Sequence, residues 1–160
     1  MADAQVASPV PRSLHSASFV ELRDSIPSHV ELISPFVDQL MGFISRFRVS
    51  DETNSAIELA LREALINAIV HGNQHNPQKR VYVKCRCAAN DEVSITIDVE
   101  GHGLGNPVVP NPSSSDHWLG GSGMDLMAAL MDEVEFERGG SAVHMRKRAR
   151  LRSDSTRKPQ

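Results

Sequence analysis

The stretch that decides the fold of this 160-residue chain is Glu63-Ala64-Leu65-Ile66-Asn67-Ala68-Ile69-Val70-His71-Gly72. At about 100° per residue, a helix over this stretch places Glu63, Asn67 and His71 on one stripe. Apolar residues flank the stripe, so the helix is expected to be buried on most sides. A buried carboxylate is costly unless it has a partner. The pattern therefore favours a functional site over a solvated polar face, which is the alternative interpretation.

The residues of this stripe suit metal-assisted chemistry. The side-chain oxygen of Asn67 is a hard ligand of the kind that Mg²⁺ prefers, and Mg²⁺ usually takes one or two protein ligands together with phosphates. A half-buried carboxylate such as that of Glu63 suits general-base catalysis. His71 and His75 have a spacing that could bind zinc, but Gly72 and the turn residues after it interrupt the helix and disfavour that site.

Two glycine clusters lie further along the chain, Gly101-His102-Gly103-Leu104-Gly105 and Gly120-Gly121-Ser122-Gly123. Glycines let backbone N–H groups approach phosphate oxygens, and the second cluster leads directly into a helix predicted from Met124. Asn106-Pro107 follows the first cluster in place of a helix, which excludes a dinucleotide-binding fingerprint. No Gly-Lys-Ser/Thr occurs, so a P-loop is excluded too. Each cluster taken alone is also compatible with a mobile loop.

The rest of the chain alternates between strand and helix patterns. We expect a first strand at residues 17–23, then a helix opened by Ser25-Ile26-Pro27, with a kink or a division at Pro35. The order of elements predicts an α/β fold, a two-layer sandwich of a mixed, mostly antiparallel sheet with helices on one face. The other elements are expected at residues 50–72 (helix), 80–88 and 92–99 (strands), 124–131 (helix), and 134–137 and 142–147 (strands).

Composition indicates one globular domain, expected at residues 16–149, between a disordered segment, 1–15, and a basic flexible tail, 150–160. The formal net charge of −3 disfavours direct nucleic-acid binding. No apolar run is long enough to cross a membrane, and no secretion signal is expected at residues 1–14. Cys85 and Cys87 are interpreted as two small hydrophobic residues of a reduced, cytoplasmic protein rather than half of a metal site.

The combined motifs resemble the Bergerat-fold (GHKL) ATPases, and among them the bacterial anti-sigma-factor serine/threonine kinases of the RsbW and SpoIIAB type. The stretch from Glu63 to Gly72 is similar to their N box, E-A-x-x-N-A-x-x-H-G. Gly101-His102-Gly103 resembles the glycine part of the G1 box, and Gly121-Ser122-Gly123-Met124-Asp125-Leu126-Met127 resembles the G2 box. Gly140-Ser141-Ala142-Val143-His144-Met145 is similar to the closing strand of these proteins.

The resemblance implies that the chain binds ATP and Mg²⁺ beneath a lid at residues 104–119. Asn67 would hold the metal, and Glu63 would be the catalytic base toward a protein hydroxyl. The implied partners are a STAS-domain anti-sigma antagonist, which would be the phosphorylation substrate, a sigma factor, and a second copy of the chain in a homodimer. The residues implied in cofactor binding are Asn67, His71, Gly101, Gly103, Gly121, Ser122, Gly123 and Met124.

One position departs from the family pattern. The G1 box normally carries aspartate two positions before its first glycine, as acceptor for the adenine amino group, and Val99 stands there. Asp98 is adjacent but is expected to point to the opposite face of the strand. Loss of such a buried hydrogen bond costs about 1–3 kcal/mol. Two functions therefore stay open, an ATP-dependent kinase and a binding module of the same fold that sequesters a regulator without nucleotide.

Overall fold

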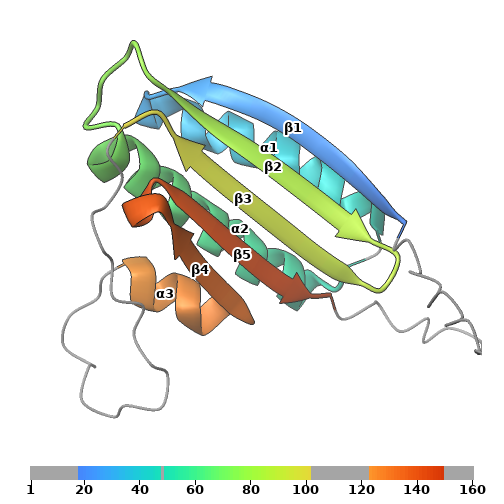
Figure 1. Ribbon diagram of the computed structural model, residues 1–160. Helices are drawn as coiled ribbons and strands as arrows, with labels where there is room; N and C mark the ends of the chain where they lie inside the picture. Colours follow the sequence, from blue (N-terminus) through green and yellow to red (C-terminus); the bar gives the residue numbers. More distant parts are fainter. Residues whose placement is uncertain (1–17, 48, 102–122, 150–160) are drawn as a thin grey trace, which may run out of the picture.

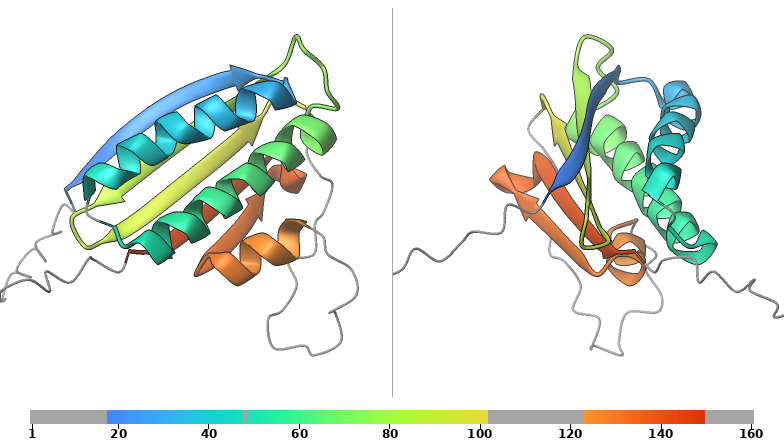
Figure 2. Two further views of the ribbon diagram at one scale, coloured as in Figure 1. Left: turned by 180° about the vertical axis from the view of Figure 1, so that it is seen from behind. Right: turned by 90° about the vertical axis from the view of Figure 1, so that its right-hand side faces the viewer.

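The computed structural model describes residues 18–47, 49–101 and 123–149. In these ranges the chain forms a two-layer α/β sandwich, with the α-helices packed on one face of a five-stranded sheet (Figures 1 and 2). The predicted fold class is thereby confirmed. The elements are β1 (Phe19–Pro27), η1 (Val30–Leu32), α1 (Ile33–Ile44), η2 (Ser45–Phe47), α2 (Asp51–Asn67), η3 (Ala68–Gly72), β2 (Arg80–Ala88), β3 (Glu92–Val99), α3 (Gly123–Leu130), β4 (Glu133–Glu137), η4 (Arg138–Gly140) and β5 (Ala142–Arg148).

The strands lie in the order β1-β2-β3-β5-β4, and each neighbouring pair in the described ranges is antiparallel. The sheet was predicted to be mixed and mostly antiparallel, and the described part has no parallel pair. The reason is the course of α1 and α2, which take the chain along the sheet and back (Figure 2). As a result β2 begins beside the end of β1, where Pro27 pairs with Arg80.

The prediction that Ser25-Ile26-Pro27 opens a helix was wrong, because these residues are the last three of β1. Ser25 continues the ladder opposite Tyr82, and the side chain of Ile26 is buried in the core. Pro27 ends an edge strand, a position where a missing N–H costs no central ladder bond. A serine followed by an apolar residue and a proline thus has the composition of a helix start without being one.

Pro35 does not kink a helix. The apolar period is divided into the 3₁₀ turn η1 and the helix α1, which begins at Ile33. Pro35 therefore falls in the first turn of α1, where backbone N–H groups have no intrahelical acceptor.

The core lies between the sheet and the helices. Alternate residues of β2 and β3 face it, beginning with Val81 and Val83 on β2 and with Val93 and Ile95 on β3. Helix α2 begins after Ser50, whose side-chain oxygen accepts a hydrogen bond from the N–H of Thr53 at 3.3 Å, as an N-cap residue does. Within the described ranges, no helix is long and apolar enough to cross a membrane.

Cys85 and Cys87 behave as the sequence predicts for two small hydrophobic residues. Both are buried in the core on the same face of β2, and both are free thiols. The hydrogen bond with Cys87, together with burial, raises the pKa of Cys85 above the ordinary range of a thiol. In the described part of the chain, no three His, Cys, Asp or Glu side chains gather as a metal-binding group.

Candidate functional site

The last turns of α2 and the start of α3 form what we call the polar rim, made of Glu63, Asn67 and Gly123. Glu63 and Asn67 are half-buried and lie one helical turn apart. Gly123 is the first residue of α3, and a Cβ atom added to it would overlap the Glu63 carboxylate. The start of α3 therefore lies directly against Glu63. The positive end of a helix dipole favours an anionic group at this place.

The helix changes its winding immediately after Asn67. Residues Ala68–Gly72 form a π-helical turn, in which the N–H of Asn73 donates to the carbonyl of Ala68, five residues earlier, at 2.8 Å. Such turns are frequent at functional sites. Because this turn breaks the α-helical spacing, His71 does not extend the stripe in the predicted way, and its side chain is exposed.

Asn73 is a structural residue of the site that sequence reasoning missed. It is fully buried, and its amide nitrogen donates to Ser28 Oγ at 2.8 Å and to the Arg80 carbonyl at 2.9 Å. Its amide oxygen accepts from the N–H of Gly101 at 2.8 Å. One side chain thus joins the ends of three strands. The only signal was an asparagine directly after the helix-ending glycine, in a run that has the composition of a loop.

Packing explains why position 101 holds a glycine. A Cβ atom on this residue would overlap the carbonyl oxygen of Gly72, so the end of β3 approaches η3 too closely for any side chain. Met124, also predicted to bind the cofactor, is half-buried in the first turn of α3. Gly103, Gly121 and Ser122, the lid at residues 104–119 and the segments 1–15 and 150–160 lie outside the described residues.

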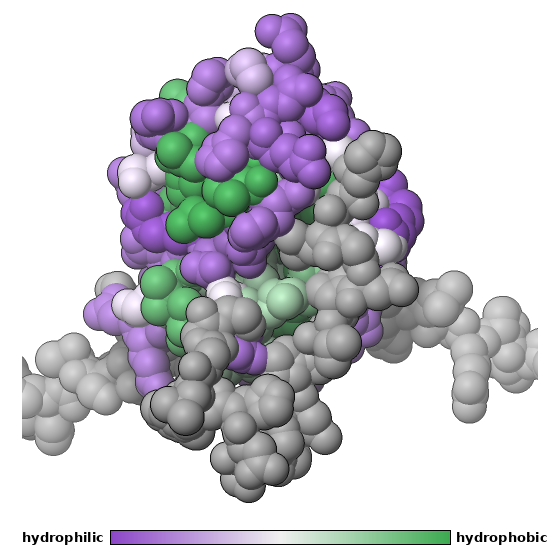
Figure 3. Space-filling model, turned by 90° about the vertical axis from the view of Figure 1, so that its left-hand side faces the viewer, coloured by the Kyte–Doolittle hydropathy of each residue, from purple (hydrophilic) through white to green (hydrophobic). Residues whose placement is uncertain are grey.

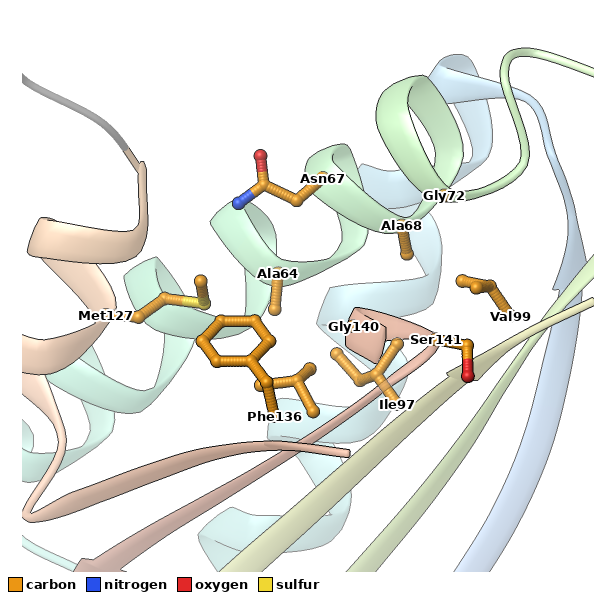
Figure 4. Close-up of a pocket in the computed structure, with 11 residues that line it drawn as sticks. Ala64, Asn67, Ala68, Gly72, Ile97, Val99, Met127, Phe136, Gly140 and Ser141 are labelled. Carbon is orange, nitrogen blue, oxygen red and sulfur yellow. The ribbon is translucent and has the colours of Figure 1, made fainter. Parts of the chain in front are cut away.

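A small apolar cavity lies beside the polar rim, between α2 and the sheet (Figure 4). It measures about 20 Å³, much less than a purine ring needs. Figure 4 shows Ala64 of α2 and Ala68 of η3 directed toward the sheet, whereas Asn67 points away from the sheet. Among the described lining residues, Asn67 and Ser141 have the polar side chains. The others are Ala64, Ala68, Gly72, Ile97, Val99, Met127, Phe136, Gly140 and Val143.

Val99 and Asp98 face opposite sides of β3, as predicted. Val99 lines the apolar cavity, and its methyl groups lie 3.1 Å from the position that a Cβ atom of Gly72 would take. Asp98 forms an ion pair with Arg138, and its side chain is 38% exposed. The Asp98 carboxylate is therefore not available inside the cavity.

Helix α2 is less buried than its composition predicts. Leu59 is 45% exposed and Ile66 is 40% exposed, although both flank the stripe that was expected to lie in the interior. The end of the molecule that holds the C-terminal end of α2 carries an apolar surface, seen in Figure 3. A face of this kind often binds another macromolecule.

The fold and the site define a class of protein, a two-layer α/β domain in which one helix, α2, brings a carboxylate and an amide to the mouth of a pocket. The sequence profile described as "Histidine kinase-like ATPase domain" matches residues 26–147. The chain therefore belongs to this family, the GHKL group that its motifs resemble.

Individual relatives point to the same family. The chain is 27% identical to an anti-sigma F factor of Heyndrickxia coagulans, over 85% of this chain and 86% of that protein. It is 31% identical to an anti-sigma F factor of Bacillus cytotoxicus, over 66% of this chain and 77% of that protein. A similar solved structure holds the RsbU and RsbW domains of Rv1364c from Mycobacterium tuberculosis. Its TM-score is 0.56 at 15% identity, which is a likeness of fold, and the match covers 82% of this chain and 32% of that one.

Proposed function

We propose that the protein is an ATP-dependent serine/threonine kinase of the anti-sigma-factor type. The single observation that carries the proposal is the polar rim, where Gly123 packs against the Glu63 carboxylate one turn from Asn67. A carboxylate base and a neutral oxygen ligand, set beside the start of a helix, make a site suited to phosphoryl transfer. Relatives named anti-sigma F factor support the same choice.

Each residue of the polar rim has a role in this proposal. Asn67 holds Mg²⁺ through its amide oxygen, and the metal, when bound, screens the charge of the phosphates. The fit is good because the half-buried Asn67 offers a hard ligand, and Mg²⁺ needs few protein ligands when phosphates supply the others. Gly121, Ser122, Gly123 and Met124 bring backbone N–H groups to the phosphates, while His71, Gly101 and Gly103 border the nucleotide.

Glu63 acts as the base. Its carboxylate accepts the proton of a serine or threonine hydroxyl on the partner, and the hydroxyl oxygen attacks the γ-phosphorus of ATP. The bond between the γ-phosphorus and the bridging oxygen to the β-phosphate breaks, ADP leaves, and the partner keeps the phosphoryl group.

The proposed partners are proteins. The phosphoryl acceptor is a STAS-domain anti-sigma antagonist, the second partner is a sigma factor, and the chain works as a cytoplasmic homodimer. Exposed apolar side chains on the same helix as Glu63, namely Leu59 and Ile66, support a protein acceptor rather than a small molecule.

A second candidate is a module that sequesters its partner without nucleotide. Two observations favour it: the described residues that line the cavity, Val99 among them, include no carboxylate, and the cavity holds only about 20 Å³. A purine ring enters only if a side chain such as Phe136, which is half-buried on the edge strand β4, moves.

The test is phosphate transfer from ATP to a STAS-domain antagonist by the wild-type chain and by Glu63→Gln. We expect the variant to keep its fold and its affinity for ATP and to lose transfer by about 100-fold or more, because general-base catalysis contributes about 10²–10⁴. Equal transfer by the variant would reject Glu63 as the base. Partner binding that is indifferent to ATP and to Asn67→Ala, with no transfer by the wild type, would establish the sequestering module.

A further inference from the structure

The strand β1 forms one edge of the sheet, and no described element pairs with its outer side (Figure 1). Two large apolar side chains are exposed at its start, since Phe19 is 50% exposed and Val20 is 52% exposed. An open edge of this kind offers backbone N–H and C=O groups to a further strand, unless charge or proline blocks it.

The hydrogen bonds at the two ends of β1 show which backbone groups point outward. The carbonyl of Ser18 accepts from the N–H of Ala89 at 3.0 Å. The N–H of Ser28 donates to the carbonyl of Lys79 at 3.1 Å, in the same register. Even-numbered residues therefore direct their backbone groups toward the β2 side. Because this direction alternates along an antiparallel strand, the odd-numbered residues of β1 direct theirs away from the sheet.

The outward row is already closed at Ser25. Its N–H donates to the Asp24 carboxylate at 2.7 Å, and its carbonyl accepts from Arg80 Nη2 at 2.9 Å. The outward groups that remain for another strand are those of Phe19, Glu21 and Arg23.

Two side chains of this row carry opposite charges. Glu21 and Arg23 project from the face of the sheet away from the helices, next to Arg86 of β2. The Glu21 carboxylate pairs with Arg86 and with Arg23 of its own chain. The Arg23 side chain is nevertheless 71% exposed, so it is accessible to a carboxylate from another chain.

This charge pattern is self-complementary in one register. When two copies of β1 meet as antiparallel neighbours with a twofold axis at Leu22, Glu21 of each copy lies opposite Arg23 of the other. A register moved by two residues opposes two glutamates or two arginines, which destabilises a sheet. A register moved by one residue sets outward backbone groups against inward ones, so the ladder loses its hydrogen bonds.

The other edge strand, β4, does not have this property. Its side chains on the face away from the helices are Glu133, Glu135 and Glu137. All three are acidic, so two copies of β4 would bring carboxylates together. Charge of one sign along an edge is a common means of preventing strand addition.

We infer that β1 is the edge through which the protein associates with a second copy of itself, with Leu22 on the twofold axis. This inference rests on the homodimer of the proposed function, and it adds the interface and its register. The two sheets become one antiparallel sheet with the helices on one face. The two Leu22 side chains meet on that face, and Glu21 and Arg23 form two ion pairs between the copies on the other.

The first experiment is disulfide trapping of the full chain under mild oxidation, without nucleotide. Leu22→Cys should give a covalent dimer, because opposite Cα atoms of a non-hydrogen-bonded pair lie about 4.5 Å apart, within the reach of a disulfide. The matched control is Val20→Cys, on the same strand and face. In this register the two copies of residue 20 lie at least about 13 Å apart, so no disulfide should form.

The second experiment measures the dimer dissociation constant by sedimentation equilibrium. Arg23→Glu should raise it by about 10-fold or more, because two ion pairs become contacts between like charges. Glu135→Arg, a charge reversal on the opposite edge strand, should leave it within about twofold of the wild type.

Efficient cross-linking of Val20→Cys would overturn the inference, as would equal weakening by Arg23→Glu and Glu135→Arg. A wild-type chain that stays monomeric would also overturn it, and phosphate transfer by that monomer would leave the kinase proposal intact. A dimer trapped through Leu22→Cys, with no transfer by the wild type, would support the interface and reject the kinase. If Leu22→Cys fails to fold, as circular dichroism would show, Arg23→Glu at its exposed position decides.

Discussion

The polar rim and the apolar cavity are both built on α2, yet they carry opposite chemistry. The rim presents Glu63 and Asn67 beside the start of α3, with hydrogen-bonding groups that suit phosphate and metal. The cavity, reached from the inner side of the same helix, is lined mainly by apolar side chains. The polar groups of the proposed nucleotide site are therefore concentrated at the rim, and the described lining of the cavity adds only Asn67 and Ser141.

This difference arises from two periodicities. Along α2, residues four apart share a face, so Glu63 and Asn67 project together, while Ala64 and Ala68, the first residue of η3, face the cavity. Along β3, neighbouring residues face opposite sides, so moving a carboxylate by one position takes it out of the cavity. Asp98 and Val99 are neighbours in β3, yet only the Val99 side chain lies on the face of the sheet that lines the cavity.

The largest expected effect comes from Gly101→Ala, which breaks the junction between the two halves. The added Cβ atom overlaps the carbonyl oxygen of Gly72, and a backbone atom cannot move aside as a side-chain tip can. We expect the free energy of unfolding to fall by about 3 kcal/mol, at the upper end of overpacking effects. Urea denaturation of the variant and the wild type measures this difference in the free energy of unfolding.

The control for that variant is Gly42→Ala. Gly42 lies inside α1 with no atom within 4 Å of an added Cβ, so alanine should stabilise the protein by about 0.5–1 kcal/mol. If both variants shift the unfolding midpoint alike, the close approach of β3 to η3 does not exist in solution.

A smaller effect is expected from Gly123→Ala, which disturbs the polar rim alone. Here the added Cβ atom overlaps the flexible carboxylate end of Glu63, which can swing away. Stability should change by less than about 1 kcal/mol, while phosphate transfer falls by about 100-fold because the base is displaced. A transfer assay measures the loss of catalysis, and ATP calorimetry on the same protein shows whether nucleotide binding is kept.

Ala129→Ser, at an exposed position of the same short helix, should leave the transfer rate unchanged. A wild-type rate in Gly123→Ala would mean that the position of the Glu63 carboxylate is not critical. Base chemistry would then have to be assigned to another group.

Much of the fold could be predicted from the sequence because its signals are local. The strands at 80–88 and 92–99, the helix start at residue 50 and the opposite directions of Asp98 and Val99 each depend on a few neighbouring residues, and each is confirmed. The end of β1 was missed because its Ser and Pro have helix-start composition, while long-range pairing with β2 decides their conformation.

The parts of the site that could not be predicted depend on distant contacts. The packing of Gly123 on Glu63 joins two residues that are far apart in the chain, and the glycine pattern alone does not reveal its neighbour. The three hydrogen bonds of Asn73 exist only once three strand ends have met. The exposure of Ile66 is likewise a property of the packed domain and not of the helical period.

The smallest expected effect comes from Asp98→Asn, which tests the direction of the two β3 side chains. Asp98 pairs with Arg138 at an exposed place, and such pairs contribute about 0–1 kcal/mol, so stability should change little. ATP affinity should stay within about twofold, because the side chain lies on the other face of the sheet from the cavity. Calorimetry on Asp98→Asn and Val99→Asn, which install the same amide one position apart, makes the comparison direct. A drop of 10-fold or more for Asp98→Asn alone would mean that Asp98 reaches the base in the nucleotide-bound protein, and the cavity would then select adenine with a carboxylate after all.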